Sequence, residues 1–292
     1  MRAVNAALRS CVTRLENHSE VFYTMNRLTI FIAGVCLLGA VAGSRNAAAE
    51  QAAAGTEQVL NLPIGAQEHQ RILYVAPTHP TGTIVMMPGG SGDVGIERDA
   101  DLRHDDNFVV RTRALWVARG YAVVIPDALD HENMRGLRSS PEYAAVVDAL
   151  VEFGHTRLKD QPVFLLGTSQ GSIAAMNGAA HAQPGQLAGL VLTESVSRLG
   201  GSHETVFDAD PAGVRIPALV VANRDDACNV APPADAPKIA SAMRNSPSAR
   251  VLYVSGGINR SRKACGSLTP HGYYGIEQPV VAQIADWIQG LR

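Results

Sequence analysis

Apolar and polar positions follow two different patterns along the chain after residue 56. Short continuous apolar runs are typical of buried strands, whereas apolar residues spaced three and four apart are typical of helices. The apolar runs predict six strands, at residues 83–87, 121–126, 162–166, 187–193, 216–222 and 250–254. Two further short strands, 57–64 and 70–75, are separated by a turn about Gly65 and are expected to pair antiparallel at the start of the sheet.

Segments with helical spacing lie between most of these runs. The predicted helices cover residues 107–119, 141–155, a stretch after residue 171, 237–243 and 276–291. Ser140 is a candidate N-cap, and Pro141 suits the first position of the helix that follows it. Strands that alternate with helices predict a mostly parallel central sheet with helices on both faces, and ligands bind such sheets at the carboxyl ends of the strands.

The first 49 residues differ from the rest. Asn26 and Arg27 provide a polar, basic start, residues 28–42 are apolar, and the small residues ending at Ala42 and Ala49 fit cleavage sites. We interpret residues 1–49 as a signal peptide with preceding residues, which predicts a secreted or periplasmic protein without stable membrane insertion after cleavage. A retained anchor is the alternative, although the apolar run is short for a membrane span.

Residues 50–292 are predicted to form a single domain, since 46% of the 292 residues are hydrophobic and can bury one large core. The 25 Lys and Arg residues nearly balance the 27 Asp and Glu residues. A chain without a basic excess or a basic patch has no field that gathers polyanions, so we expect no nucleic-acid partner. The sequence contains no signal for an oligomeric state.

Ser169 lies between Gly167 and Gly171 in the sequence Gly-Thr-Ser-Gln-Gly, directly after an apolar run and before a segment rich in small residues. This order predicts a strand, a sharp turn and a helix with the serine at the apex, where its hydroxyl could act as a nucleophile. The alternative is an ordinary glycine turn with a surface serine.

Three other segments follow predicted strands. Pro88 to Gly92 form a glycine loop after strand 83–87, and its backbone N–H groups could approach a ligand closely. Asp225 and Asp226 follow strand 216–222, and His271 lies in a late loop after the last strand. A base and an acid placed in this way could activate the serine.

These features together resemble the α/β-hydrolase superfamily over about residues 57 to 292. The resemblance implies that Ser169 is the nucleophile, His271 the base, and the Gln170 N–H one donor of the oxyanion hole. Gly90 or Ser91 would supply the second donor, and the sequence does not choose between them.

The resemblance leaves two candidates for the acid. Asp226 is preferred, since its position two residues before Cys228 resembles a subgroup of the superfamily; Asp225 is the alternative. Glu194, at the end of strand 187–193, is a less favoured substitute.

The implied function is a serine esterase that hydrolyses small-molecule carboxylic esters through an acyl-enzyme intermediate, with no cofactor and no metal. Residues 194–215 are too few for a large lid, which favours an accessible site and small or flexible substrates. Cleavage of amides or thioesters and acyl transfer would use the same triad. A non-catalytic binding protein with this fold is an alternative from a different functional class.

Removal of the signal would leave Cys228 and Cys265 as the two cysteines of the mature chain. We predict a disulfide between them, which would join the acid loop to the histidine loop; two free buried thiols are the alternative. Of the remaining histidines, His131 is expected near the pocket. His104 has no metal-binding spacing.

Overall fold

A computed structural model describes residues 55–64 and 68–291, which belong to a compact unit spanning Ala52–Arg292. The predicted signal peptide, its predicted cleavage sites and the predicted turn about Gly65 lie outside the described residues. Within the described part of the chain, no helix is long and apolar enough to cross a membrane.

Eight strands form one sheet in the order β1-β2-β4-β3-β5-β6-β7-β8. The strands are β1 (Thr56–Ile64), β2 (Glu68–Ala76), β3 (Thr83–Met87), β4 (Ala122–Pro126), β5 (Val163–Thr168), β6 (Gly189–Thr193), β7 (Ala218–Asn223) and β8 (Ala249–Val254). The first two strands pair antiparallel and β2 runs antiparallel to β4, whereas β3 to β8 are all parallel. The predicted fold class is therefore confirmed.

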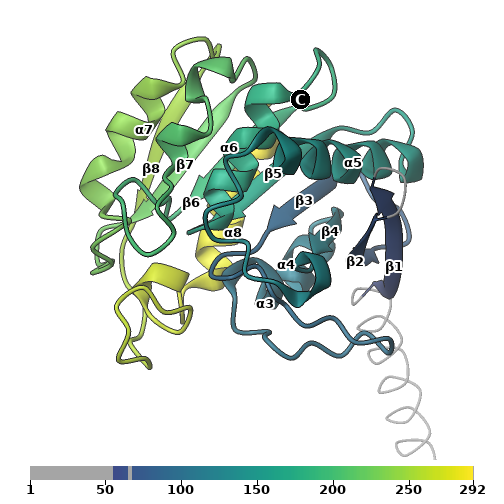
Figure 1. Ribbon diagram of the computed structural model, residues 1–292, viewed down its shortest axis with the longest axis horizontal. Coiled ribbons are helices and arrows are strands. Elements are labelled where there is room, and N and C mark those ends of the chain that lie inside the picture. Colours follow the sequence, from purple (N-terminus) through teal and green to yellow (C-terminus); the bar gives the residue numbers. More distant parts are fainter. Residues whose placement is uncertain (1–54, 65–67, 292) are drawn as a thin grey trace, which may run out of the picture. The chain divides into compact units, whose positions relative to one another are not determined.

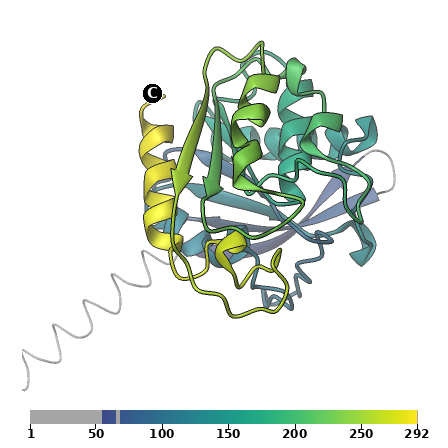
Figure 2. The same ribbon diagram turned by 90° about the vertical axis from the view of Figure 1, so that its left-hand side faces the viewer.

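Helices cover both faces of this sheet (Figures 1 and 2). Most of the buried apolar residues of α5 (Pro141–Arg157), α6 (Gly171–His181) and α7 (Ala236–Ala242) belong to one apolar cluster. Those of α3 (Phe108–Arg111), α4 (Arg113–Val117) and α8 (Glu277–Gln289) belong to the other. Successive strand residues point to opposite faces, so the fully buried strands contribute to both clusters and read as continuous apolar runs.

The start of α5 follows the predicted cap, because the Ser140 hydroxyl accepts a hydrogen bond from the Tyr143 N–H at 3.2 Å. The predicted single helix over 107–119 is wrong: it is divided into α3 and α4 at Thr112. The Thr112 hydroxyl donates to the Phe108 carbonyl at 2.7 Å. Such local side-chain bonds compete with regular helix geometry.

Short 3₁₀ helices occupy several of the loops at the carboxyl ends of the strands and nearby. They are η1 (Leu129–His131), η2 (Val206–Asp208), η3 (Pro211–Gly213), η4 (Pro233–Asp235) and η5 (Pro270–Gly272). The connection from β6 to β7 contains only η2 and η3, so no large lid domain is inserted there.

Candidate active site

Ser169 lies at a sharp turn between β5 and α6, with a φ angle of 52° in the left-handed region. Its N–H donates to the Thr193 carbonyl at 2.9 Å, which fixes the turn to the end of β6. A non-glycine residue in this region is strained, and such strain is often concentrated at functional sites. The turn holds the serine at the carboxyl edge of the sheet.

The two glycines of the elbow provide space rather than an unusual backbone conformation, because neither has a positive φ angle. A Cβ atom added to Gly167 would lie 2.3 Å from the Gly171 carbonyl oxygen. A Cβ atom on Gly171 would lie 2.1 Å from the Met87 carbonyl oxygen. The strand, the turn and the helix can therefore approach one another only if both positions lack side chains.

His271 is buried in η5, where its N–H donates to the Thr269 hydroxyl at 3.1 Å. Its Nε2 atom lies 2.9 Å from Ser169 Oγ. Its Nδ1 atom lies 2.7 Å from Asp226 Oδ2. An Nδ1–H that donates to Asp226 leaves Nε2 free to accept the serine proton.

The two adjacent carboxylates have different surroundings. Asp226 is buried, and its second oxygen, Oδ1, accepts the Cys228 N–H at 2.7 Å. Asp225 is exposed and accepts the Gly256 N–H at 2.6 Å. Because the His271 ring is hydrogen-bonded to Asp226, the geometry favours Asp226 as the acid.

Two links connect the loop after β7, which carries Asp226 (the acid loop), with the loop after β8, which carries His271 (the histidine loop). The predicted disulfide between Cys228 and Cys265 is present, with the two Cα atoms 4.6 Å apart. The buried Asn223 side-chain amide donates to the Gly256 and Pro270 carbonyls, both at 2.9 Å. The relative position of Asp226 and His271 therefore depends on more than their own hydrogen bond.

The predicted oxyanion donors come from two segments, the elbow and the glycine loop. Within the described residues, the N–H groups of Gln170, Gly90 and Ser91 have no hydrogen-bond acceptor. The glycine loop lies against the elbow, because a Cβ atom on Gly89 would be 3.2 Å from Ser169 Cβ. Gln170 immediately precedes α6, so the positive end of the helix dipole is also directed at this region.

Solved structures with the same fold include esterases. No family model matches the sequence, and no curated protein matches it significantly. A dienelactone hydrolase from Anabaena variabilis aligns at 15% identity with a TM-score of 0.56, over 81% of this chain and 98% of that one. A Pyrococcus furiosus esterase aligns at 11% identity with a TM-score of 0.56, over 82% and 95%.

A cold-adapted esterase from an Arctic intertidal metagenomic library aligns at 15% identity with a TM-score of 0.55, over 79% and 94%. The chain has the α/β-hydrolase fold. At these identities the likeness establishes the fold alone.

Within this α/β-hydrolase fold, a cleft of about 450 Å³ opens beside Ser169 and His271. The glycine loop forms one side, and Cys265 of the disulfide lies on another. The lining includes charged residues of both signs, Asp93, Asp106, Arg135 and Lys263, together with His104. These wall residues lie in loops that lack strand or helix patterns, and so the sequence did not identify them.

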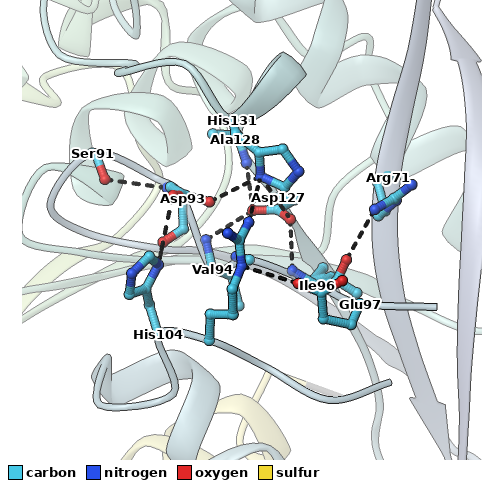
Figure 3. Close-up of polar contacts among 12 residues, drawn as sticks. Arg71, Ser91, Asp93, Val94, Ile96, Glu97, His104, Asp127, Ala128 and His131 are labelled. Atoms are coloured by element: carbon cyan, nitrogen blue, oxygen red, sulfur yellow. Dashed lines mark hydrogen bonds and ion pairs between the residues drawn. The ribbon is translucent and has the colours of Figure 1, made fainter. Parts of the chain in front are cut away.

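The expectation for His131 is wrong. His131 lines a separate depression with Asn61 and Arg71, and it is His104 that lines the cleft. The two histidines lie on opposite sides of Asp93: His104 Nδ1 is 3.1 Å from the Asp93 carbonyl oxygen, and His131 Nδ1 is 3.1 Å from Asp93 Oδ1 (Figure 3). Residue 131 has a positive φ angle, which local pattern did not predict.

The sequence pattern also did not lead us to Asp127, although its position directly after β4 could have indicated a residue at the carboxyl edge of the sheet. Its carboxylate accepts the N–H groups of Val94, Gly95 and Ile96 at 2.8, 3.0 and 2.8 Å (Figure 3). A buried carboxylate with several N–H donors stabilises the loop that carries them. Asp127 thereby anchors the continuation of the glycine loop.

Two groups of residues in the described part of the chain have ligand atoms close enough to share a metal ion. One is Asp93, Asp127 and His131, but Arg103 Nη2 lies 3.3 Å from His131 Nδ1 and already places a positive charge there. The other is Glu194 with Asp226 and His271, whose histidine is hydrogen-bonded to Ser169. Protein groups therefore engage the histidine of each set, whereas Glu194 Oε2 has no hydrogen-bond partner within the described residues.

Proposed function

We propose that this protein is a serine hydrolase that cleaves carboxylic esters through an acyl-enzyme intermediate. The observation that carries the proposal is the hydrogen-bonded chain from Ser169 Oγ to His271 Nε2 at 2.9 Å and from His271 Nδ1 to Asp226 Oδ2 at 2.7 Å. Ser169 and His271 line a cleft at the carboxyl edge of the sheet, which is where α/β folds of this kind bind ligands. The esterases among the structural neighbours give further support.

In the first half of the reaction, Ser169 Oγ bonds to the ester carbonyl carbon while His271 Nε2 takes the hydroxyl proton. Asp226 remains ionised and stabilises the imidazolium cation. When the tetrahedral intermediate collapses, the bond from carbon to the leaving oxygen breaks. His271 returns its proton to that oxygen, and the alcohol departs.

In the second half, a water molecule takes the place of the alcohol. His271 removes a proton from the water as its oxygen bonds to the acyl carbon, and the bond to Ser169 Oγ then breaks. The serine recovers its proton and the carboxylic acid is released. In both halves, the N–H groups of Gln170 and of Gly90 or Ser91 would stabilise the negative oxygen.

The open cleft supports small esters as substrates. No large lid covers the site, and the charged wall offers little apolar surface for a long acyl chain. Amides, thioesters and acyl transfer to an acceptor other than water would use the same residues. Assays with different substrates and acceptors separate these reactions, because the reactions share the nucleophile and differ in the leaving group or in the acceptor.

The deciding experiment is a series of p-nitrophenyl esters from acetate to palmitate, assayed alongside an anilide and a thioester. We expect the highest kcat/KM for short acyl esters. Ser169→Ala should lose on the order of 10⁴-fold or more in kcat, whereas Ser255→Ala, a change at an exposed serine, should retain native activity. Native turnover by Ser169→Ala would refute the assignment, and no turnover of any acyl compound would favour the binding-protein alternative.

We further propose that residues 1–49 direct export and are removed. The apolar segment and its small-residue flank support this, as does the Cys228–Cys265 disulfide, a bond that persists in oxidising compartments. Amino-terminal sequencing of protein from the native host should give a start just after Ala42 or Ala49. An intact start at Met1 or Met25 in the membrane fraction would instead indicate an anchor.

A further inference from the structure

Glu194, the first residue after β6, is a buried carboxylic acid that the reaction described above does not use. Only 1% of its surface is exposed. Its φ angle is 44°, in the left-handed region, and its N–H donates to the Val221 carbonyl at 3.1 Å. A buried charged residue type in a strained backbone conformation is rarely retained without a role.

The two oxygens of Glu194 have unequal surroundings. Oε1 accepts the Asn223 N–H at 2.8 Å. Oε2 is fully buried and has no donor to accept from within the described residues. Glu194, Asp226 and His271 nevertheless each offer a ligand atom within 4.8 Å of the others. An ionised Glu194 would therefore place a buried oxygen without a donor beside a second carboxylate, an arrangement that burial strongly disfavours.

A proton on Oε2 removes this conflict, because the oxygen then becomes a donor. Asp226 has acceptor capacity to spare: Oδ1 accepts the Cys228 N–H and Oδ2 accepts the His271 Nδ1–H, and each oxygen has two lone pairs. We propose that Glu194 is a neutral carboxylic acid that donates its Oε2–H to the Asp226 carboxylate. In this role it is a positioning residue, which holds Asp226 against His271. The inference rests on the proposed function.

The electrostatic surroundings support the neutral form. Burial raises the pKa of Glu194 well above its ordinary value, the charge of Asp226 and a hydrogen bond to Asp226 raise the pKa further, and the Asn223 N–H opposes the shift. The Tyr273 hydroxyl donates to the Val221 carbonyl at 3.1 Å. The other titratable groups of the cluster are His271 and Tyr273. Burial raises the pKa of Tyr273 well above its ordinary value, so the phenol also stays neutral.

One negative charge rather than two then faces His271. A single carboxylate stabilises the imidazolium cation during the reaction. A second carboxylate within 4.8 Å would favour the imidazolium cation in the resting enzyme as well, whereas a general base has to start from the neutral imidazole. The neutral Glu194 thus orients Asp226 without changing the charge of the triad.

Two variants, Glu194→Gln and Glu194→Ala, distinguish a neutral Glu194 that donates a hydrogen bond from an ionised Glu194. A glutamine side chain can accept the Asn223 N–H and donate to Asp226, so kcat/KM should stay within about threefold of native and the acidic limb of its pH profile should not move. Alanine removes a hydrogen bond to a charged group, so we expect a loss of about tenfold to hundredfold. If Glu194 were ionised, Glu194→Gln would remove a negative charge near His271 and lower the acid-limb pKa by about two units, which would overturn the proposal.

An infrared difference spectrum between native protein and Glu194→Gln reads the proton directly, without turnover. We expect a protonated carboxyl C=O band at pH 7 that shifts in D₂O and persists in Ser169→Ala. A carboxylate band in its place would overturn the neutral acid. If no ester is hydrolysed, the proposed function fails while the infrared band still decides the state of Glu194.

Discussion

Removal of the disulfide by the double substitution Cys228→Ala with Cys265→Ala should destabilise the protein by an amount set by the loop that the bond closes. The two cysteines are separated by 37 positions. For a loop of that length, the chain-entropy model gives about 3.8 kcal/mol at 25 °C. In a domain of this size, 1 kcal/mol corresponds to roughly 2–4 °C in Tm, so we expect Tm to fall by about 8–15 °C.

The same substitution should lower kcat. The Cys228 N–H donates to Asp226 Oδ1, and Cys265 lies six residues before His271 on the wall of the cleft. Release of the bond would give the acid and histidine loops more freedom relative to each other, although Asn223 still links them. KM should change less than kcat, because the loops position the reacting groups.

Calorimetric melting and ester turnover, each measured with and without reductant, form the assay. Reductant should lower the Tm of native protein and leave the double variant unchanged. A double variant that melts within about 2 °C of native protein would show that the bond contributes little stability, and the loop-closure argument would be refuted.

Asp226→Asn should lose on the order of 10⁴-fold in kcat in steady-state assays, because the wrong histidine tautomer is then favoured; Asp225→Asn should lose far less, and the reverse order would identify Asp225 as the acid. Gly171→Ala should give little folded protein by circular dichroism, since its Cβ atom would lie 2.1 Å from a backbone carbonyl oxygen of β3, whereas Gly201→Ala, with nothing within 4 Å, should fold normally. Equal yields of the two would contradict the close-approach argument. The raised pKa of Glu194 means that the unfolded chain releases this proton above about pH 4.5 while the folded chain keeps it. Native stability in urea should therefore fall relative to that of Glu194→Gln as pH rises above that value, with a slope that approaches about 1.4 kcal/mol per pH unit, and a constant difference between the two proteins would count against a retained proton.

The sequence predicted the sheet well because every central strand is buried on both faces and is therefore a continuous apolar run. It also predicted the chain order of serine, acid and histidine at the strand ends, and the structure brings Ser169, Asp226 and His271 within hydrogen-bond distance. The break at Thr112 was not predictable in the same way, since it depends on one side-chain bond within an otherwise helical pattern.

Other features depend on contacts between distant segments. Asp225 and Asp226 are adjacent, and which of them faces His271 depends on how the loop after β8 holds Asn223. Likewise, the sequence placed Glu194 at the correct edge of the sheet, but its closeness to Asp226 appears only when β6 and β7 are paired. Strand ends can thus be located by pattern, whereas side-chain partners at those ends cannot.

The central claim is that Ser169 forms a covalent bond during turnover, and its most direct test is mass spectrometry after reaction with a fluorophosphonate. Native protein should gain one phosphonyl group, and peptide mapping should place it on Ser169. Ser169→Ala should remain unlabelled while it keeps the native fold. A labelled Ser169→Ala protein, or a native protein that hydrolyses esters yet takes up no label, would contradict the account.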